Sequence, residues 1–503
     1  MNFWDFSSWG FFNLIAVLLA SLLVAQMLKR SIPALKASLI PTSVLGGGVL
    51  LLLSSIFKWI TGEEMFDTAF FGGSGTAWLE LLTYHTLALG FTASALKSSG
   101  SKMTKERSIE IFNTGLTTVA TYLLQAFAGM IICILFALVL PDLLEAAGLL
   151  LALGYGQGPG QAMNYGGIYE VDYGFIGGKS FGLTVASMGF LSASIGGVFY
   201  LNVLKRRGKI SLDKGSGQLR EQVEGSNEIP MQESIDKFTI QIALIVVAYM
   251  LAYGMMYGLG CLLPGMRATI YGFNFLLGVL SGTLVKTVIN VCRKHNIIHR
   301  SYTNDFLLTR ATNFFYDIMV TASIAAIRMS IIGKYWAVLL VMGVVGLVIT
   351  YIYVHFVCKK LFPTYAEQQF LAMFGMLTGT ASSGIILLRE IDGDFKTPVS
   401  DNLVYQNFPA MVFGFPILLL ATMAPTKPYL TLSIVFVFMI VINTLLLRSL
   451  IFKKKVKVKL PGRAIPARPS FCYPAPVILQ IVVCRADKAF SLRRRCPAGA
   501  DEV

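Results

Sequence analysis

The sequence predicts an all-α polytopic membrane protein, an inverted-topology repeat of two five-span halves, each with a re-entrant hairpin, plus one extra C-terminal span. Of the 503 residues, 55% are hydrophobic and only 14% are charged, which is too little polar side chain to cover a soluble globule of this length. Apolar runs of about twenty residues, enough to cross a bilayer, recur along most of the chain. Two shorter apolar runs end in glycine-rich polar stretches.

The apolar runs divide the chain into two membrane repeats. The first repeat covers 1–204 and the second, inverted repeat covers 238–424, with a polar cytoplasmic linker, 205–237, between them. A basic tail, 453–503, is rich in proline and is expected to be disordered. The expected spans are 10–28, 39–57, 76–96, 112–140 and 180–204, then 238–262, 269–291, 306–330, 335–358 and 402–424, and finally the additional span 429–452.

Two segments are too short to span a bilayer and predict re-entrant hairpins. Residues 143–155 and 365–377 each form about a dozen apolar positions, which as helix cover about half of the hydrocarbon layer. Each leads into a glycine-rich polar stretch, so we expect hairpins near 143–176 and near 365–392. Where a helix stops inside the membrane, its last carbonyls are free for a cation and the first N–H groups of the next helix are free for an anion.

The distribution of charge predicts the orientation of the spans. Basic residues follow the first, third and fifth spans, which places those loops in the cytoplasm and the N-terminus outside. They are Lys29, Arg30, Lys36, Lys97, Lys102, Lys105, Arg107, Lys205, Arg206, Arg207 and Lys209. The opposite loops carry the acids Glu63, Glu64, Asp67, Asp142 and Glu145. In the second half, the loops expected in the cytoplasm also carry basic residues, which are Arg293, Lys294, Arg300, Lys359 and Lys360. Two further basic residues, Arg328 and Lys334, fall on the expected outer side.

The two halves also share a short motif. GFTASAL at 90–96 matches MVTASIA at 319–325, and the hairpin tips at Gly158 and Gly379 occupy similar relative positions. Each tip is followed by acids about twelve residues later. Matching positions combined with opposite orientation are typical of the inverted repeats of secondary transporters, so we expect a transport function.

Neutral oxygen-rich side chains surround both tips, which suits a polar solute and a weakly held monovalent cation. The predicted substrate-binding residues are Gln157, Gly158, Gly160, Gln161, Asn164, Arg310, Thr380, Ser382 and Ser383. The predicted sodium-binding residues are Thr92, Ser94, Asp317, Thr321, Ser323, Thr378 and Gly379. Two structural alternatives stay open: the small residues could serve helix packing, and Arg310 could pair with Asp317 or extend to the membrane surface. His85 and Gln125 are interpreted as polar residues of the core.

Four of these segments resemble the sodium/glutamate symporter family: GYGQGPGQAMNYGG at 154–167, YGF at 173–175, GFTAS at 90–94 and LTGTASSG at 377–384. The resemblance covers about residues 8–424. It implies ten spans with the N-terminus outside, a homodimer, sodium-coupled uptake of acidic amino acids and an elevator-type movement. The chain departs from the family in its first tip, GQGPGQA, in the Ser and Thr of its second tip, and in the span 429–452.

The sequence therefore predicts sodium-coupled symport of glutamate or a similar acidic amino acid across the cytoplasmic membrane. The alternative is a proton-coupled or sodium-coupled transporter of another organic anion, such as a dicarboxylate. A channel or an intramembrane enzyme is disfavoured, because no HExxH motif, aspartate pair or Ser/Lys arrangement lies in an apolar run. The expected partners are a small anionic solute, sodium as the coupling ion and membrane lipid. No further cofactor or metal is expected. The chain has a net charge of +15, but the tail after Phe452 holds twelve Lys/Arg and three Asp/Glu, so most of this charge lies in the tail and nucleic acid binding is not expected.

Overall fold

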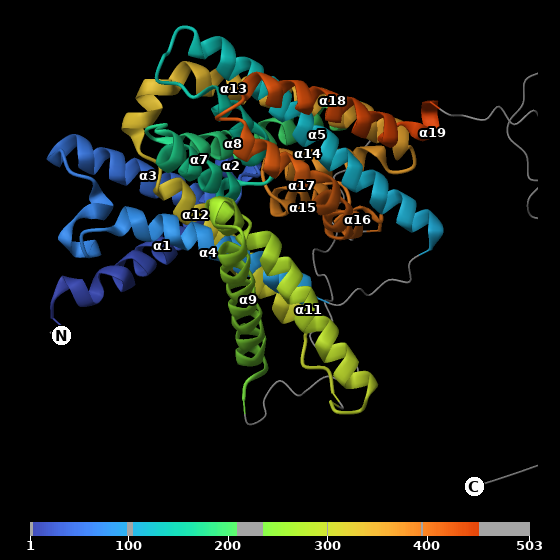
Figure 1. The fold of residues 1–503 in the computed structure, drawn as a ribbon, viewed down its shortest axis with the longest axis horizontal. Coiled ribbons are helices and arrows are strands. Elements are labelled where there is room, and N and C mark those ends of the chain that lie inside the picture. Colours follow the sequence, from blue (N-terminus) through green and yellow to red (C-terminus); the bar gives the residue numbers. More distant parts are fainter. Residues whose placement is uncertain (1–3, 98–103, 209–234, 299, 394–395, 452–503) are drawn as a thin grey trace, which may run out of the picture. The chain divides into compact units, whose positions relative to one another are not determined.

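In the computed structural model, residues 4–97, 104–208, 235–298, 300–393 and 396–451 are described. Most of the predicted linker 205–237 and the whole of the tail 453–503 lie outside these ranges. Every regular element of the described residues is a helix (Figure 1). The all-helical part of the sequence prediction is therefore confirmed.

Eight helices are long and apolar enough to cross a membrane, which makes the chain a polytopic membrane protein. They are α1 (Phe6–Ser31), α3 (Thr42–Thr61), α5 (Lys105–Ala137), α8 (Gly178–Arg206), α9 (Lys237–Leu262), α11 (Asn274–Lys294), α13 (Met329–Leu361) and α18 (Pro428–Leu446). A ninth crossing is added if α16 (Val399–Tyr405) and α17 (Asn407–Met423), bent by 46°, count as one broken span. The smaller elements outside the hairpins are α2 (Pro33–Ala37), α10 (Arg267–Gly272), α19 (Arg448–Ile451), η1 (Met65–Asp67), η2 (Ala69–Phe71) and η4 (Pro264–Met266).

Three of the eleven expected spans differ from the structure: 402–424 is divided between α16 and α17, and two others are not among the candidate crossings. Residues 76–96 and 306–330 form the helices α4 (Gly75–Leu96) and α12 (Asp305–Ala325), which have the length of a span but are not apolar enough to qualify as one. These two helices pack against each other, and each also contacts further helices. Glu80 of α4 forms an ion pair with Lys179 of α8, at 2.6 Å, whereas Arg310 of α12 is exposed.

Side-chain caps mark the starts of α5 and α12. The Thr104 hydroxyl accepts a hydrogen bond from the Arg107 N–H at the start of α5, at 3.3 Å. Asn304 accepts from the Leu307 N–H, at 2.8 Å, at the start of α12. An N-cap oxygen satisfies one of the N–H groups that a first helical turn leaves free, so polar residues mark these boundaries in an otherwise apolar sequence.

Small residues bring α3, α4, α11 and α12 close together. α4 packs against α11 and α12 packs against α3, while α1 packs with α3 and α9 with α11. A Cβ on Gly47 of α3 would lie 2.7 Å from Ile324 Cβ of α12. A Cβ on Gly278 of α11 would lie 2.6 Å from the Thr92 Oγ1 of α4. Contacts this short require glycine, which allows the close helix approach common in membrane proteins.

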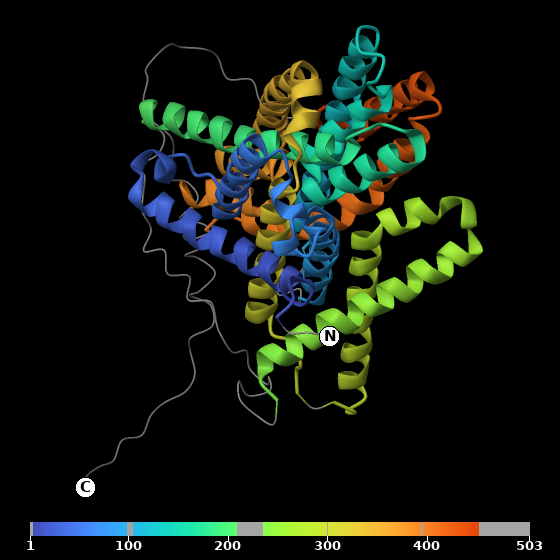
Figure 2. The same cartoon turned by 90° about the vertical axis from the view of Figure 1, so that its left-hand side faces the viewer.

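A second group of helices forms around α5. This helix contacts α13, α17, α18 and the first hairpin, and its side chains Leu116, Leu123 and Met130 are fully buried. The first hairpin is fixed to α17 by Tyr165 and Tyr169, whose hydroxyls donate to the carbonyls of Leu418 and Ala421 at 2.9 and 2.8 Å. Figure 2 shows the same helices from a direction at right angles to Figure 1.

Large apolar side chains remain exposed on many of the spans, as lipid-facing helices require. Trp59 of α3 is 87% exposed, and Val247 of α9 and Phe199 of α8 are more than half exposed. In water such surfaces would favour aggregation, whereas in a bilayer they are solvated. Lys334, which fell on the expected outer side, lies 2.9 Å from the Asp142 carboxylate. Lys334 is thus paired with Asp142, an acid of a predicted outer loop.

We predict that Gly129→Ala destabilises the fold. A Cβ on Gly129 of α5 would lie 2.1 Å from the Gly148 carbonyl oxygen, so backbone has to shift, at a cost of about 1–3 kcal/mol. Gly254→Ala is the matched control, because a Cβ there meets nothing within 4 Å. Thermal unfolding of the purified proteins in detergent should give a lower midpoint for Gly129→Ala alone. Equal midpoints for the two variants would contradict the packing of α5 on the first hairpin.

Candidate functional site

The first predicted hairpin contains a helix break at Gly158. Its first limb runs through η3 (Glu145–Leu149) into α6 (Leu150–Gly156), and its second limb is α7 (Pro159–Tyr173). Gly158 has a φ of +88°, which is open to glycine without steric cost, and Pro159 follows at the first helical position. α6 and α7 contact each other. The glycine and proline of the GQGPGQA segment therefore end one helix and start the next.

The second predicted hairpin has the same construction. α14 (Ala366–Thr378) and α15 (Ala381–Arg389) are separated by Gly379 and Thr380, and the two helices pack together. A Cβ on Gly375 of α14 would lie 2.8 Å from the Gly384 Cα of α15, so the limbs touch through glycine. In both hairpins the first limb is too short to cross a bilayer, as the sequence predicts.

The two hairpin tips meet. A Cβ on Gly158 would lie 3.9 Å from the Thr380 Cγ2, although the two residues are more than two hundred positions apart in the sequence. A cavity of about 150 Å³ opens beside this contact, and residues of both tips line it, including Gln157, Gln161 and Gly379. We define this tip cavity as the candidate functional site.

A third break adds polar groups to the tip cavity. α16 and α17 join at Gln406 with a bend of 46°, and Gln406 and Asn407 both line the cavity. All four amide side chains of the cavity therefore come from positions within a few residues of a helix break. The apolar part of the lining comes partly from the unbroken helices α4, α11 and α12, through Leu87, Phe91, Phe275, Tyr316 and Met319, and partly from α14 and α17.

One helix, α5, supplies partners for all three breaks. The Tyr122 hydroxyl donates to the Gly156 carbonyl at the end of α6, at 2.8 Å. The Gln125 amide donates to the Leu377 carbonyl near the end of α14, at 2.9 Å. The Thr118 hydroxyl donates to the Gln406 side-chain oxygen, at 2.8 Å. The first two bonds satisfy carbonyls that a helix end leaves without intrahelical partners, and the third holds the Gln406 side chain at the break between α16 and α17.

Several buried polar atoms at the tips have no hydrogen-bond partner among the described residues. Both amide atoms of Gln161 are unpartnered although this residue is 1% exposed, and so is the Gln157 side-chain oxygen. The Ser383 hydroxyl, in the first turn of α15, is unpartnered as well. A buried polar group without a partner costs about 1–3 kcal/mol. Four such atoms beside one cavity indicate a place where a polar ligand completes the hydrogen bonding.

The structure groups most of the predicted substrate-binding residues at the tips but separates two of them. Gln157, Gln161 and Thr380 line the cavity, and Gly158, Gly160, Ser382 and Ser383 are at the breaks beside them. Asn164 instead approaches the Gly272 carbonyl of α10, at 3.5 Å. Arg310 is exposed, lies 5.0 Å from the ring centre of Phe306, and does not line the cavity. The tip cavity is thus built without this cation.

The predicted sodium-binding residues are spread over more than one interface. Thr92 donates to the Ala88 carbonyl and faces α11, whereas Thr321 bonds to the carbonyls of Asp317 and Ser43 and faces α3. Asp317 is exposed on α12, two positions from the cavity residue Met319. The remaining predicted positions lie on α4, α12 and the second tip, and they are Ser94, Ser323, Thr378 and Gly379. No cluster of three or more His, Cys, Asp or Glu that could hold a metal occurs in the described ranges.

Sequence reasoning missed the contribution of α16 and α17. Residues 402–424 were expected to form one continuous span, and no cavity residue was predicted there. The signal was present in the segment YQNFPA, where a polar pair precedes Pro409 within an apolar run. A proline restrains the residue before it and removes a backbone donor, so it favours a break at this place.

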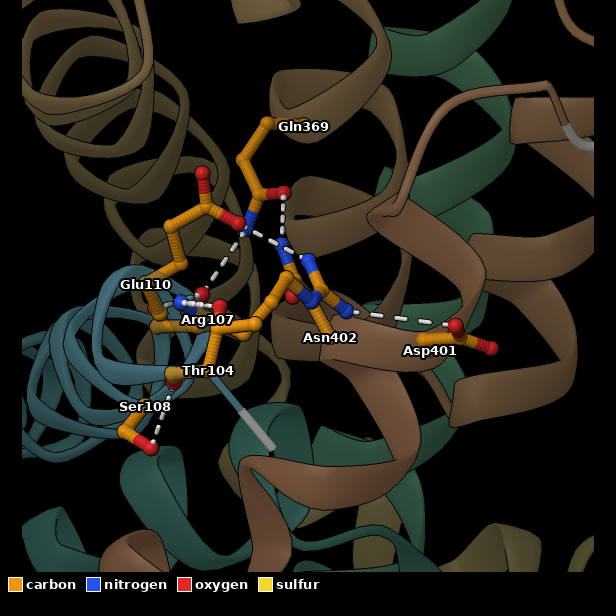
Figure 3. Close-up of polar contacts among 8 residues, drawn as sticks. Thr104, Arg107, Ser108, Glu110, Gln369, Asp401 and Asn402 are labelled. Carbon is orange, nitrogen blue, oxygen red and sulfur yellow. Dashed lines mark hydrogen bonds and ion pairs between the residues drawn. The ribbon is translucent and has the colours of Figure 1, made fainter. Parts of the chain in front are cut away.

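A second polar cluster lies near the start of α5 and is interpreted as structural (Figure 3). Arg107 bonds to Glu110 at 2.8 Å and lies 3.9 Å from Asp401 of α16. Next to this ion pair, the Asn402 amide donates to Gln369 of α14, at 3.4 Å. Arg107 links α5 to Asp401 of α16, and Gln369 of α14 also donates to the Thr114 hydroxyl of α5, so the cluster holds α16 and the second hairpin against α5.

Comparison with known protein families and with curated proteins finds no match to this chain. The functional conclusion therefore depends on the geometry of the tip cavity.

We predict opposite effects on stability for two glutamine variants. Gln125→Leu leaves the Leu377 carbonyl and the Thr350 hydroxyl without their donor and should cost about 1–3 kcal/mol. Gln161→Leu removes two atoms that have no partner, so it should keep or raise the unfolding midpoint. Thermal unfolding in detergent without added solute measures both. A Gln161→Leu protein that is the less stable of the two would mean that the Gln161 amide is bonded within the fold.

Proposed function

We propose that this protein is a secondary active transporter that binds a carboxylate-bearing solute in the tip cavity and moves it together with sodium. The observation that carries the proposal is the meeting of two helix breaks at one cavity with unpartnered amide groups. Helix breaks inside a membrane are costly and occur where backbone lines a cavity. Transporters use the freed N–H and C=O groups to bind solute and ion.

The packing of the helices supports the inverted repeat on which alternating access would depend. α4, the helix with the first TAS motif, packs on α11, the second span of the second half. α12, the helix with the second TAS motif, packs on α3, the second span of the first half. α5 packs on α17, and α13 packs on α8. These reciprocal partners are what a repeat with a pseudo-twofold axis requires. Such a repeat allows the two halves to exchange conformations around a fixed site, for instance in an elevator-type movement.

Sodium is the favoured coupling ion because the groups near the tips are neutral oxygens. Carbonyls at the ends of α6 and α14, together with the Thr378 and Thr380 hydroxyls, suit a weakly held monovalent cation. Asp317 is exposed on α12 and does not line the cavity, and in the proton-coupled alternative its carboxylate would be the group that carries the proton.

Glutamate or a similar acidic amino acid is the solute that the resemblance to sodium/glutamate symporters favours, and we propose that the chain is a divergent relative of that family. The same resemblance leads us to propose that the protein is a homodimer in the cytoplasmic membrane with its N-terminus outside. A transporter of another organic anion is the second candidate. It is favoured by the position of Arg310 outside the cavity, because this leaves the side-chain carboxylate of glutamate without its expected cation.

Sodium-driven uptake tests the proposal directly. The purified protein in proteoliposomes should accumulate a labelled amino acid or carboxylic acid under an inward sodium gradient, and should lose this activity when potassium replaces sodium. Counterflow against a panel of amino and dicarboxylic acids then ranks the solutes. Uptake driven equally by a proton gradient without sodium would favour the proton-coupled alternative, and passive flux that depends on no gradient would indicate a channel.

We predict that Gly158→Val and Gly379→Val abolish uptake without preventing membrane insertion. Valine is strained at the positive φ of Gly158, and a Cβ on Gly379 would lie 2.9 Å from the Ser383 hydroxyl, so both changes displace a tip. Gly254→Val is the matched control, since the space around Gly254 is open. Uptake assays and size-exclusion profiles should separate lost transport from lost assembly. Normal uptake by either tip variant would mean that these glycines serve helix packing and not transport.

A further inference from the structure

We propose, on the basis of the transport function above, that the tip cavity selects a small monocarboxylate with an apolar remainder, such as a neutral amino acid with an aliphatic side chain. Glutamate and dicarboxylates would then be poor solutes. Three properties of the cavity lead to this class: its lack of charged side chains, the two helix starts at its polar end, and its apolar walls.

The described residues that line the cavity include no Asp, Glu, Lys, Arg or His. Their polar side chains are the amides of Gln157, Gln161, Gln406 and Asn407, the hydroxyl of Thr380 and two tyrosines. Tyr122 already donates its proton to the Gly156 carbonyl, and the Gln406 amide already donates to Asn407. The buried amide of Gln161, which has no partner among the described residues, is therefore one side-chain donor available for an anion.

Two helix starts provide a place for one carboxylate. α7 begins at Pro159 and α15 begins at Ala381, and neither Gly158 nor Thr380 caps its helix with a side-chain hydrogen bond. First-turn N–H groups and the positive end of the helix dipole attract an anion. The unpartnered and buried Gln161 amide and Ser383 hydroxyl lie in these same first turns. One carboxylate would give both side chains the partner that they lack.

The rest of the cavity suits an apolar group. Its walls include Phe91, Phe275, Phe415, Met319, Met376 and Met411. The whole cavity, its polar end included, has a volume of about 150 Å³, and an apolar cavity of this size can hold one benzene molecule. The volume therefore limits the solute to a small molecule. Methionine and phenylalanine adapt to an apolar group without offering it a hydrogen bond.

A second carboxylate would be poorly held in this cavity. It would leave water for aromatic and thioether surroundings without a cationic partner, and an unpaired buried charge is strongly destabilising. An α-ammonium group has a better partner, because the unpartnered Gln157 oxygen can accept a hydrogen bond from it. The uncharged lining thus favours a carboxylate with at most one compensating positive charge on the solute.

Competition in proteoliposomes tests the class of solute. Labelled leucine and labelled glutamate are each offered under an inward sodium gradient, and unlabelled leucine, 4-methylpentanoate, leucinamide and glutamate are added as competitors. Leucine should be taken up, and glutamate and leucinamide should need at least tenfold higher concentrations to compete. Competition by 4-methylpentanoate would show that the carboxylate and apolar group suffice, and its failure beside effective leucine would assign the site to the zwitterionic form.

A variant of Gln161 tests the carboxylate position. Gln161→Glu keeps the size of the side chain but places a negative charge beside the helix starts, so it should reduce leucine uptake at least tenfold and raise the half-saturating concentration. Glutamate uptake stronger than leucine uptake would overturn the monocarboxylate class while leaving the transporter proposal intact. Effective competition by leucinamide would overturn carboxylate binding at the helix starts. Absence of sodium-driven uptake of every solute would overturn the proposed function itself.

Discussion

The hydrogen bonds from α5 to the ends of the broken helices are the interactions on which the rest of the site depends. Inside a bilayer, a helix that stops leaves carbonyl and N–H groups that water cannot reach, and each costs several kcal/mol if it stays unpaired. Tyr122 and Gln125 satisfy carbonyls at the ends of α6 and α14, two hairpins that are remote in sequence. A single straight helix therefore sets the distance between both tips, and the cavity forms where they meet.

The sequence predicted those parts of the fold that depend on local pattern. Glycine, proline and a short apolar run were enough to predict the break at Gly158 and the one at Gly379, because each constraint acts within a few residues. The break at Gln406 was missed, since 402–424 has the length and hydropathy of one span. Its bend is stabilised by a contact with Thr118, nearly three hundred positions away, which no local pattern contains.

Two of the predicted site residues lie outside the cavity lining for a different reason. Arg310 and Asp317 were selected because ionisable groups are rare at membrane depth, and such a choice identifies the helix but not the direction of the side chain. On α12 the face towards the cavity presents Tyr316 and Met319, while Asp317 and Arg310 are exposed. Side chains one or two positions apart on a helix point in different directions, so the orientation could be known only from the packing of α4 and α3 on α12.

An uncharged cavity also gives a physical reason for ion coupling. If the site carried a fixed cation, the empty transporter would have to bury an unpaired charge during its return step, at a large desolvation cost. A site of amides and helix ends is neutral when empty. For a monocarboxylate without an ammonium group, the site is negative when the solute is bound alone, and it is neutral again when sodium binds as well. Both the empty and the fully loaded states then avoid the cost, whereas the half-loaded state does not. On the proposed function, this difference makes binding of solute and sodium mutually reinforcing without any direct contact between distant residues.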